Sequence, residues 1–296
     1  MQQIDSSVRT KWCEVGDAPA AVVDSGEVFS VDTTSFTEGY TAKTMHTLGA
    51  LTTERSRAPL TAPIVVRGAQ PGDTLRLDVL DLTFTRDFGC VLLSPGKGAF
   101  PDVTEALLAR AVPVDDYQVH LSERVKIPTR KMLGKVSVAP AGERQLCNTP
   151  GAYGGNMDNR DITVGSSVYL PVNVDGAHLG VGDAHAVQGD GECGISAVEV
   201  EMRCLLRATV LPDLGLRTPV VRSPDAMMTM GAASTLDAAA GEALAEMHRL
   251  LQRHEGLSPQ EAAMLISLVG DVHVSQLVNP LKSVKVKVPR RCLPLP

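Results

Sequence analysis

The chain has 296 residues, of which 44% are hydrophobic, so it can fold around a substantial core. Its 28 Lys and Arg residues against 34 Asp and Glu residues give a net charge of −6, which provides no cationic field for a nucleic-acid backbone. No apolar run is long enough to cross a bilayer and the first residues lack a signal-peptide pattern, so we predict a soluble cytoplasmic protein without nucleic-acid or membrane partners.

Short extended segments between turns dominate the first two hundred residues. Apolar side chains alternate from Leu75 to Val79, as in a half-buried strand, and the alternation then slips by one residue. A β-bulge near Val79 would explain that slip. Similar extended runs are predicted at 135–139, 168–174 and 198–204. In the last run the alternation places Glu199 on the polar face.

The last quarter contains two predicted helices. Residues 234–237 (Ser-Thr-Leu-Asp) resemble a capping box before a helix over 236–254, and Ser258, Pro259 and Glu261 form a cleaner helix start. The chain closes with an alternating strand over 284–289, whose lysines and proline suit a sheet edge.

These patterns predict a mainly β (α+β) fold. We expect a β-sandwich or barrel-like core with a C-terminal helical pair, built as a single domain over 1–296 with a helical insertion at 234–270. The six cysteines are far apart and form no CxxC pair, so we predict free thiols.

Polar and glycine residues concentrate between positions 151 and 201. In about ten residues Asp183, His185, Asp190 and Glu192 offer metal ligands or proton carriers, and Gln188 adds an amide. On an extended chain the first two share a face, and the intervening glycines permit a reversal that brings the other two beside them. The alternative is an Asp-Gly-rich hairpin whose carboxylates only cap turns, but a turn has no use for so many convergent titratable groups.

Two motifs resemble the acetamidase/formamidase family. They are Gly-Gly-Asn-Met-Asp at 154–158 and Gly-Asp-x-His-Ala-x-Gln-Gly-Asp-Gly-Glu at 182–192, and the resemblance extends from about residue 60 to the end. It implies a largely β architecture, hydrolysis of short carboxamides to carboxylate and ammonia, self-association as a dimer or higher oligomer, and a divalent metal near these motifs. Residues 1–60 diverge from the family. If they line the substrate pocket, the substrate differs from formamide or acetamide.

A metal-activated water is the economical nucleophile, because the chain has no Gly-x-Ser-x-Gly elbow. We assign Asp158, Asp183 and His185 as ligands of a divalent metal, with zinc as the first candidate and calcium as the alternative.

Proton transfer and substrate orientation are assigned to the same two motifs. Glu192 is the predicted general base and acid, with Asp190 and Gln188 beside it as further catalytic residues. Asn156 and Gln188 are expected to orient the substrate amide. Cys193 is a poor candidate nucleophile, because adjacent residues on an extended chain face opposite sides.

Two rival functions stay open at this stage. The scaffold could serve a biosynthetic cyclase or lyase that uses Glu192 for proton transfer, which the divergent residues 1–60 motivate. It could also serve a non-catalytic small-molecule binding protein, against which the intact polar cluster argues.

Overall fold

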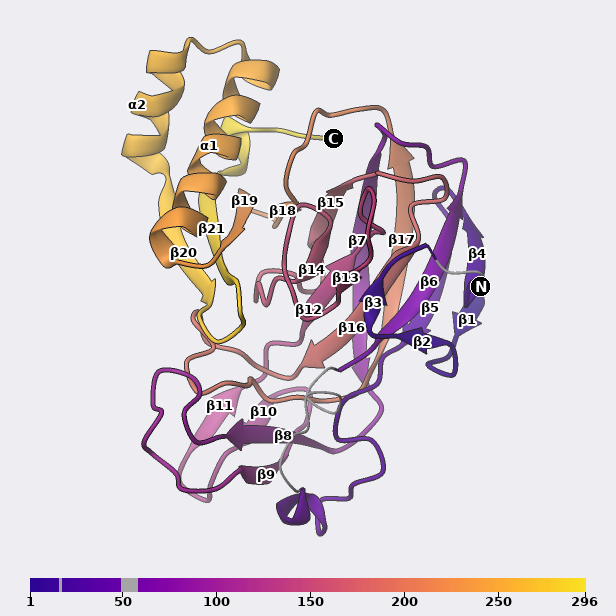
Figure 1. Cartoon of the computed structure of the whole chain (residues 1–296), viewed down its shortest axis with the longest axis vertical. Helices are drawn as coiled ribbons and strands as arrows, with labels where there is room; N and C mark the ends of the chain where they lie inside the picture. Colours follow the sequence, from indigo (N-terminus) through magenta and orange to yellow (C-terminus); the bar gives the residue numbers. More distant parts are fainter. Residues whose placement is uncertain (16–17, 49–57) are drawn as a thin grey trace.

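The computed structural model of the chain describes residues 1–15, 18–48 and 58–296. Two large β-sheets make up the centre of the molecule, with two helices at one end and a small β unit at the other (Figure 1). The predicted mainly β fold with a C-terminal pair of helices is confirmed.

The first large sheet has nine strands among the described residues. Their order is β1 (Gln2–Ile4), β5 (Val28–Asp32), β17 (Met202–Leu211), β7 (Thr74–Phe84), β15 (Ser167–Pro171), β18 (Val220–Arg222), β19 (Ala226–Ala233), β21 (Lys282–Pro289) and β20 (Asp271–Gln276).

The second large sheet carries most of the residues expected in the site. Within the described ranges its order is β14 (Gly154–Asn156), β12 (Met132–Ser137), β16 (Leu179–His185), β6 (Leu60–Arg67) and β2 (Arg9–Thr10), with β4 (Ala21–Asp24) also paired to β6. Leu77 and Leu206 of the first sheet pack with Ile64 and Val181 of the second in one buried cluster, so the two sheets share an apolar core.

Three smaller strand pairs complete the β structure of the described residues. They are β8 (Phe88–Leu93) with β9 (Leu108–Pro113), β10 (Gln118–His120) with β11 (Lys126–Pro128), and β3 (Trp12–Cys13) with β13 (Gln145–Leu146). A 3-10 turn, η1 (Met45–Thr47), packs on β9, and a second, η2 (Arg290–Cys292), follows β21.

The bulge predicted near Val79 is confirmed. Leu205 of β17 pairs with Asp81 and the next residue, Leu206, pairs with Val79, so Leu80 is the extra residue on β7. The prediction for 198–204 was wrong in its first half, because β17 begins only at Met202 and Glu199 before it forms isolated bridges to Cys90 and His185.

The helices α1 (Leu236–Glu255) and α2 (Pro259–Val269) cover one end of the nine-stranded sheet. The capping box of Ser258 and Glu261 is present as predicted. At α1 the predicted start at Leu236 is confirmed, but the N-cap is Thr235, which accepts from the Ala238 N–H, and not Ser234 as the capping-box pattern implied.

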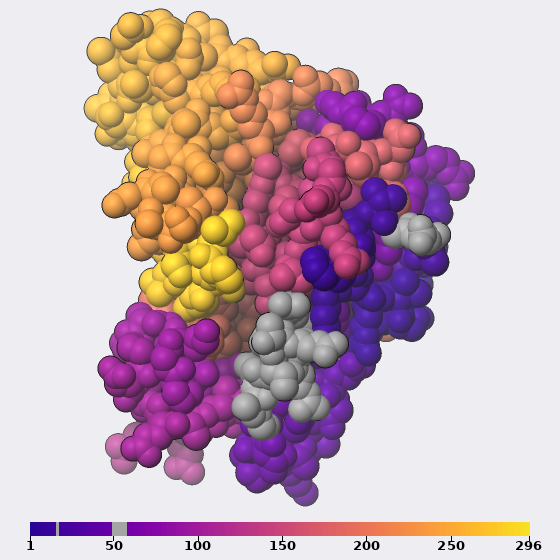
Figure 2. All heavy atoms as spheres, viewed as in Figure 1, coloured from indigo at the N-terminus to yellow at the C-terminus, as the bar shows by residue number. Residues whose placement is uncertain are grey.

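The final strand is not the sheet edge that its pattern predicted. β21 lies between β19 and β20, and β20 forms the edge. Lys285 on β21 is only 1% exposed, because three polar partners hold its ammonium group. The turn between β20 and β21 reaches the surface beside the β8 to β11 unit (Figure 2).

The described residues contain no helix that is long and apolar enough to cross a membrane. All six cysteines lie in the described part of the chain and none of them forms a disulfide, as predicted.

Candidate active site

Three carboxylate residues of the predicted site have left-handed backbone conformations. Asp183 (φ 56°) lies near the end of β16, Asp158 (φ 45°) follows β14, and Glu192 (φ 45°) lies in the loop after β16. Non-glycine residues rarely adopt this conformation, and the strain persists only where the surroundings enforce it. Such strain is concentrated here at the side chains expected to carry the chemistry.

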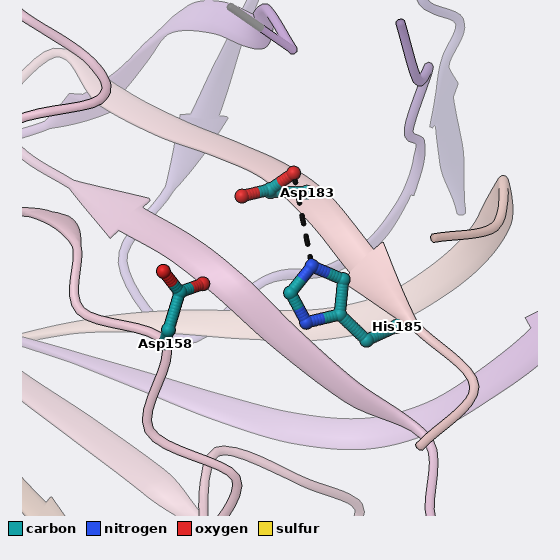
Figure 3. Close-up of side chains that lie close together, drawn as sticks. All are labelled: Asp158, Asp183 and His185. Atoms are coloured by element: carbon teal, nitrogen blue, oxygen red, sulfur yellow. Dashed lines mark ion pairs between the residues drawn. The ribbon is translucent and has the colours of Figure 1, made fainter. Parts of the chain in front are cut away.

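The side chains of Asp158, Asp183 and His185 converge although they come from separate segments. Their ligand atoms all lie within 4.8 Å of one another, and Figure 3 shows the Asp158 carboxylate directed into the space beside the other two. Asp183 Oδ1 lies 3.8 Å from His185 Nε2. A second group with the same spacing contains His185, Glu192 and Glu199, so the imidazole belongs to both.

Gln188 fixes the orientation and the tautomer of His185. The amide nitrogen Nε2 of Gln188 donates to the carbonyl oxygens of Asp158 (2.6 Å) and Ser275 (3.2 Å), so Gln188 Oε1 must accept from His185 Nδ1, which is 2.9 Å away. Nδ1 therefore carries a proton and Nε2 faces the carboxylates. Metal-ligating histidines are held in this way, with one ring nitrogen donating to an oxygen and the other free to bind.

Several buried polar atoms of this cluster lack a hydrogen-bond partner among the described residues. They are His185 Nε2, Asp158 Oδ1 and Asn156 Oδ1. Buried polar atoms without partners are rare in folded proteins and mark a place where a ligand or ion completes the structure. One imidazole nitrogen and several carboxylate oxygens form a donor set that suits a divalent cation. The residues present thus fit a metal ion.

Lys135 and Gly134 of β12 form the wall behind the carboxylates. Lys135 is 2% exposed, and its Nζ lies 3.2 Å from Asp183 Oδ2 and donates to the Ala58 carbonyl at 3.0 Å. A methyl group on Gly134 would lie 2.5 Å from Asp158 Oδ1, so only glycine leaves room for the carboxylate. Neither residue was predicted to belong to the site.

The acidic groups perturb one another because they are buried together. Burial, followed by the facing Asp183 carboxylate, raises the pKa of Asp158 to about 7. Burial also raises the pKa of Glu192 well above its usual range. Burial alone would raise the pKa of Asp183 as well, but Lys135 holds it well below the normal value. The cluster therefore combines a carboxylate held ionised with carboxyl groups that readily hold a proton.

A cavity of about 200 Å³ opens onto these groups. The acidic side chains and the amides of Asn156 and Asn279 line one side, while Phe36, Leu92 and Ile195 provide apolar surface. Phe36 belongs to the segment that diverges from the expected family pattern, so that segment does line the cavity.

Comparison with known proteins gives this cavity a context. Residues 118–292 match the family model described as Acetamidase/Formamidase family. The fold superimposes on a crystal structure of a predicted acetamidase/formamidase from Thermoanaerobacter tengcongensis with a TM-score of 0.94 and 32% identity, over 99% of this chain and 97% of that one. The chain belongs to the acetamidase/formamidase family.

Other family relatives agree with this assignment. The acetamidase of Bacillus halodurans superimposes with a TM-score of 0.92 and 33% identity, over 98% of this chain and 97% of that one. A formamidase of Methylophilus methylotrophus is 24% identical over 73% of this chain and 68% of its own length. A candidate formamidase of Schizosaccharomyces pombe is 38% identical over 89 residues, which span only 28% of this chain and 22% of that protein. The family comprises hydrolases of linear amides.

Within this family member, the structure separates the residues that the sequence had grouped. Asp158, Asp183, His185 and Glu192 come together, and Asn156 lines the cavity beside them. Gln188 is close, but its amide is fully engaged with His185 and two carbonyl groups. Asp190 lies apart from this cluster and accepts from Lys285 Nζ at 2.9 Å.

Lys135 and Glu199 are site residues that the sequence analysis missed. Glu199 is 5% exposed and its Oε2 lies 3.3 Å from His185 Nε2, whereas alternation had placed it on the polar face. Two isolated antiparallel bridges, to Cys90 and His185, hold the backbone of Glu199 between those two residues, so the face that the pattern assigns to solvent is covered. For Lys135 a signal existed, because a lysine in the apolar run Met-Leu-Gly-Lys-Val needs a buried partner.

Proposed function

We propose that this chain hydrolyses a short carboxamide to a carboxylate and ammonia at the cluster of Asp158, Asp183, His185 and Glu192. The observation that carries the proposal is a pair of buried atoms without hydrogen-bond partners in a member of an amidase family. Asp158 Oδ1 belongs to a side chain that lines the cavity, and His185 Nε2 lies behind it, 3.3 Å from Glu199 Oε2. Turn-capping carboxylates would have found partners in the backbone, which these atoms have not.

Asp158, Asp183 and His185 are the proposed ligands of a divalent metal. Zinc is the first candidate because an imidazole nitrogen is among the donors, and calcium is the alternative because carboxylate oxygens outnumber it. A divalent ion bound there would lower the pKa of a coordinated water and polarise the amide carbonyl.

The side chains around the cavity supply the proton transfer. The pKa of Glu192 is raised by its burial, so this group takes a proton from the attacking water and delivers it to the departing nitrogen, which cannot leave as an anion. Its Oε1 accepts from the Ala197 N–H at 2.9 Å, which holds the carboxyl group in place.

Two further side chains would bind the amide group. The unpartnered Asn156 Oδ1 would accept an N–H of the substrate. Lys135 lines the same cavity, and an ammonium group with two polar contacts keeps a third N–H for the substrate carbonyl oxygen. Gln188 takes the different role of orienting His185.

The apolar side of the cavity receives the acyl substituent in this proposal. Phe36 and Ile195 pack in a small apolar cluster that also contains the buried Leu92. Since Phe36 lies in the divergent first 60 residues, the preferred acyl group is expected to differ from that of formamide.

Ammonia release from formamide, acetamide and longer aliphatic amides tests the proposal. We expect release from at least one amide, and loss of it after chelation with recovery on adding zinc. An unreactive protein that binds amides would support the binding-protein alternative, and consumption of an amide without ammonia would support the cyclase or lyase alternative.

Self-association as a homodimer or higher oligomer stays a prediction. The strand over 284–289 does not supply the surface for it, because Val284, Val286 and Val288 are buried. On α2, however, Met264 and Leu268 are exposed and offer an apolar contact. Light scattering at micromolar concentration tests this, and a monomer would contradict it.

A further inference from the structure

The ammonium group of Lys285 is saturated by three acceptors although its side chain is 1% exposed. Its Nζ donates to Asn159 Oδ1 at 3.0 Å, Asp161 Oδ2 at 2.7 Å and Asp190 Oδ1 at 2.9 Å. An ammonium group has three N–H donors, so every donor is used. Lys285 has no donor left for a substrate, which excludes a direct catalytic role.

These three acceptors lie on the two loops that carry the site. Asn159 and Asp161 follow Asp158 by one and three residues, and Asp190 precedes Glu192 by two residues. Asp158 and Glu192 are both held in the left-handed conformation, which the surroundings must enforce. One buried cation thus ties together the segments that present two of the site carboxylates.

Neighbouring residues of β20 and β21 reinforce these ties. Ser283 Oγ donates to the Met157 carbonyl at 2.7 Å, one residue before Asp158. The Gly191 N–H donates to the Ser275 carbonyl at 3.0 Å, one residue before Glu192. The C-terminal hairpin therefore contacts both loops next to the reacting groups, and Lys285 makes the charged contact.

We propose that Lys285 is a positioning residue for the active site. Through Asn159, Asp161 and Asp190 it fixes the separation of Asp158 and Glu192, and thereby the shape of the metal-binding cluster. Asp190 acts through Lys285 in this arrangement. The inference rests on the proposed metal site, and its test includes measurements that do not depend on amide turnover.

Lys285→Met is the primary variant because methionine keeps the length and apolar stem of lysine and removes the donors. Lys287→Met is the matched control, since Lys287 lies two residues further on the same strand and makes none of the three bonds. With folding checked by circular dichroism, we expect the zinc Kd of Lys285→Met to rise 10- to 100-fold and kcat to fall similarly, with KM nearly unchanged. Lys287→Met should match the wild type.

Hydrogen exchange provides the second readout, in zinc-free protein. Lys285→Met should lose protection in residues 156–161 and 188–197 and keep it elsewhere, for example in β7 and β17. A role confined to global stability would lower protection throughout and leave the zinc Kd of the folded variant unchanged, which would overturn the proposal.

Asp190→Asn carries the test if Lys285→Met fails to fold, because asparagine keeps an oxygen acceptor for Lys285 and removes only the charge. We expect a smaller rise in zinc Kd, and where both variants fold the two effects should be less than additive. Additive effects, or an unchanged Kd in Asp190→Asn, would contradict positioning through Lys285. If the wild type binds no zinc, the metal site fails, and the exchange pattern alone decides the positioning role.

Discussion

Two buried lysines in this molecule have opposite surroundings. Lys285 donates to three side-chain oxygens and leaves no neighbouring carboxylate of its network unpaired. Lys135 makes two polar contacts and lines a cavity. It lies among carboxyl groups, and one carboxylate oxygen there, Asp158 Oδ1, has no hydrogen-bond partner in the described structure. Burial and residue type are the same, and only the degree of polar satisfaction differs.

This difference separates a structural polar network from a functional one. A network whose polar atoms all have hydrogen-bond partners stabilises one arrangement of the chain. A network with unpartnered polar atoms leaves those atoms able to bind a ligand. The cluster at Lys135 also contains the strained residues Asp158, Asp183 and Glu192. The predictions below test whether the two networks respond as differently as their hydrogen bonding implies.

The largest effect is expected for His185→Ala, because His185 is the one nitrogen ligand among the three proposed metal ligands. Bound zinc and amide hydrolysis should be lost together while the fold is retained, as measured by elemental analysis, ammonia release and circular dichroism. His120→Ala, at a partly exposed histidine of β10, should change neither. Stoichiometric zinc in His185→Ala would refute the ligand assignment.

Glu192→Gln should lower kcat by roughly 10²- to 10⁴-fold with zinc content preserved, because it keeps the shape and removes the proton carrier. The matched control is Glu246→Gln. Glu246 is also buried, but it lies on α1 and accepts from Arg249 and from the Arg217 N–H. Its replacement should therefore lower Tm and leave kcat unchanged. Loss of zinc in Glu192→Gln would make Glu192 a ligand.

Gly134→Ala should lower kcat by roughly 10²-fold, since the added methyl group displaces the Asp158 carboxylate. Gly241→Ala on α1 is the control, because the new methyl group meets nothing within 4 Å. It should raise the free energy of unfolding by about 0.5 to 1 kcal/mol and leave kcat unchanged. Equal kinetic behaviour of the two variants would show that the Asp158 position is not critical.

The smallest predicted effect is the pH dependence of zinc-free stability. The pKa of Asp158 is raised to about 7 and that of Glu192 is raised well above normal. Between the lower pKa values of the unfolded chain and these raised values, the folded chain therefore binds more protons than the unfolded chain. Stability present at low pH is then lost as pH rises through the folded pKa values. We expect the free energy of unfolding to fall on the order of 1 to 3 kcal/mol from about pH 5 to pH 8.

Urea unfolding in the presence of a chelator measures this loss. Asp158→Asn should make the pH dependence shallower because it removes one of the titrating groups. Stability that rises over the same interval would contradict the proposed burial of protonated carboxyl groups. Zinc affinity should change in the opposite direction, since protons compete with the ion for the same atoms.

Local patterns predicted the elements whose signals lie within a few residues. The slip of alternation at Val79 and the capping box at Ser258 were both visible in the sequence and are present in the structure. The alternation around Lys285 fits an exposed edge equally well, and only the order of the strands decides that β21 is internal. Sheet order depends on contacts between distant segments, which local patterns do not encode.

The site follows the same division. Asp183 and His185 could be paired from their spacing on one strand, and the structure brings them together. The separation of Asp190 from Glu192 could not be predicted, because it depends on Lys285, almost a hundred residues further along the chain. Glu199 was hidden because both faces of this segment are buried: Val198 and Val200 lie in the apolar core, and the face that alternation assigns to polar residues is covered by the site.

Diffraction from zinc-soaked crystals, recorded at the zinc absorption edge, tests the central claim most directly. An anomalous peak within coordination distance of His185 Nε2 and of the Asp158 and Asp183 carboxylates is the result that this account predicts. A peak at Asp190 instead, or no peak at His185 under conditions where the protein hydrolyses amides, would contradict it.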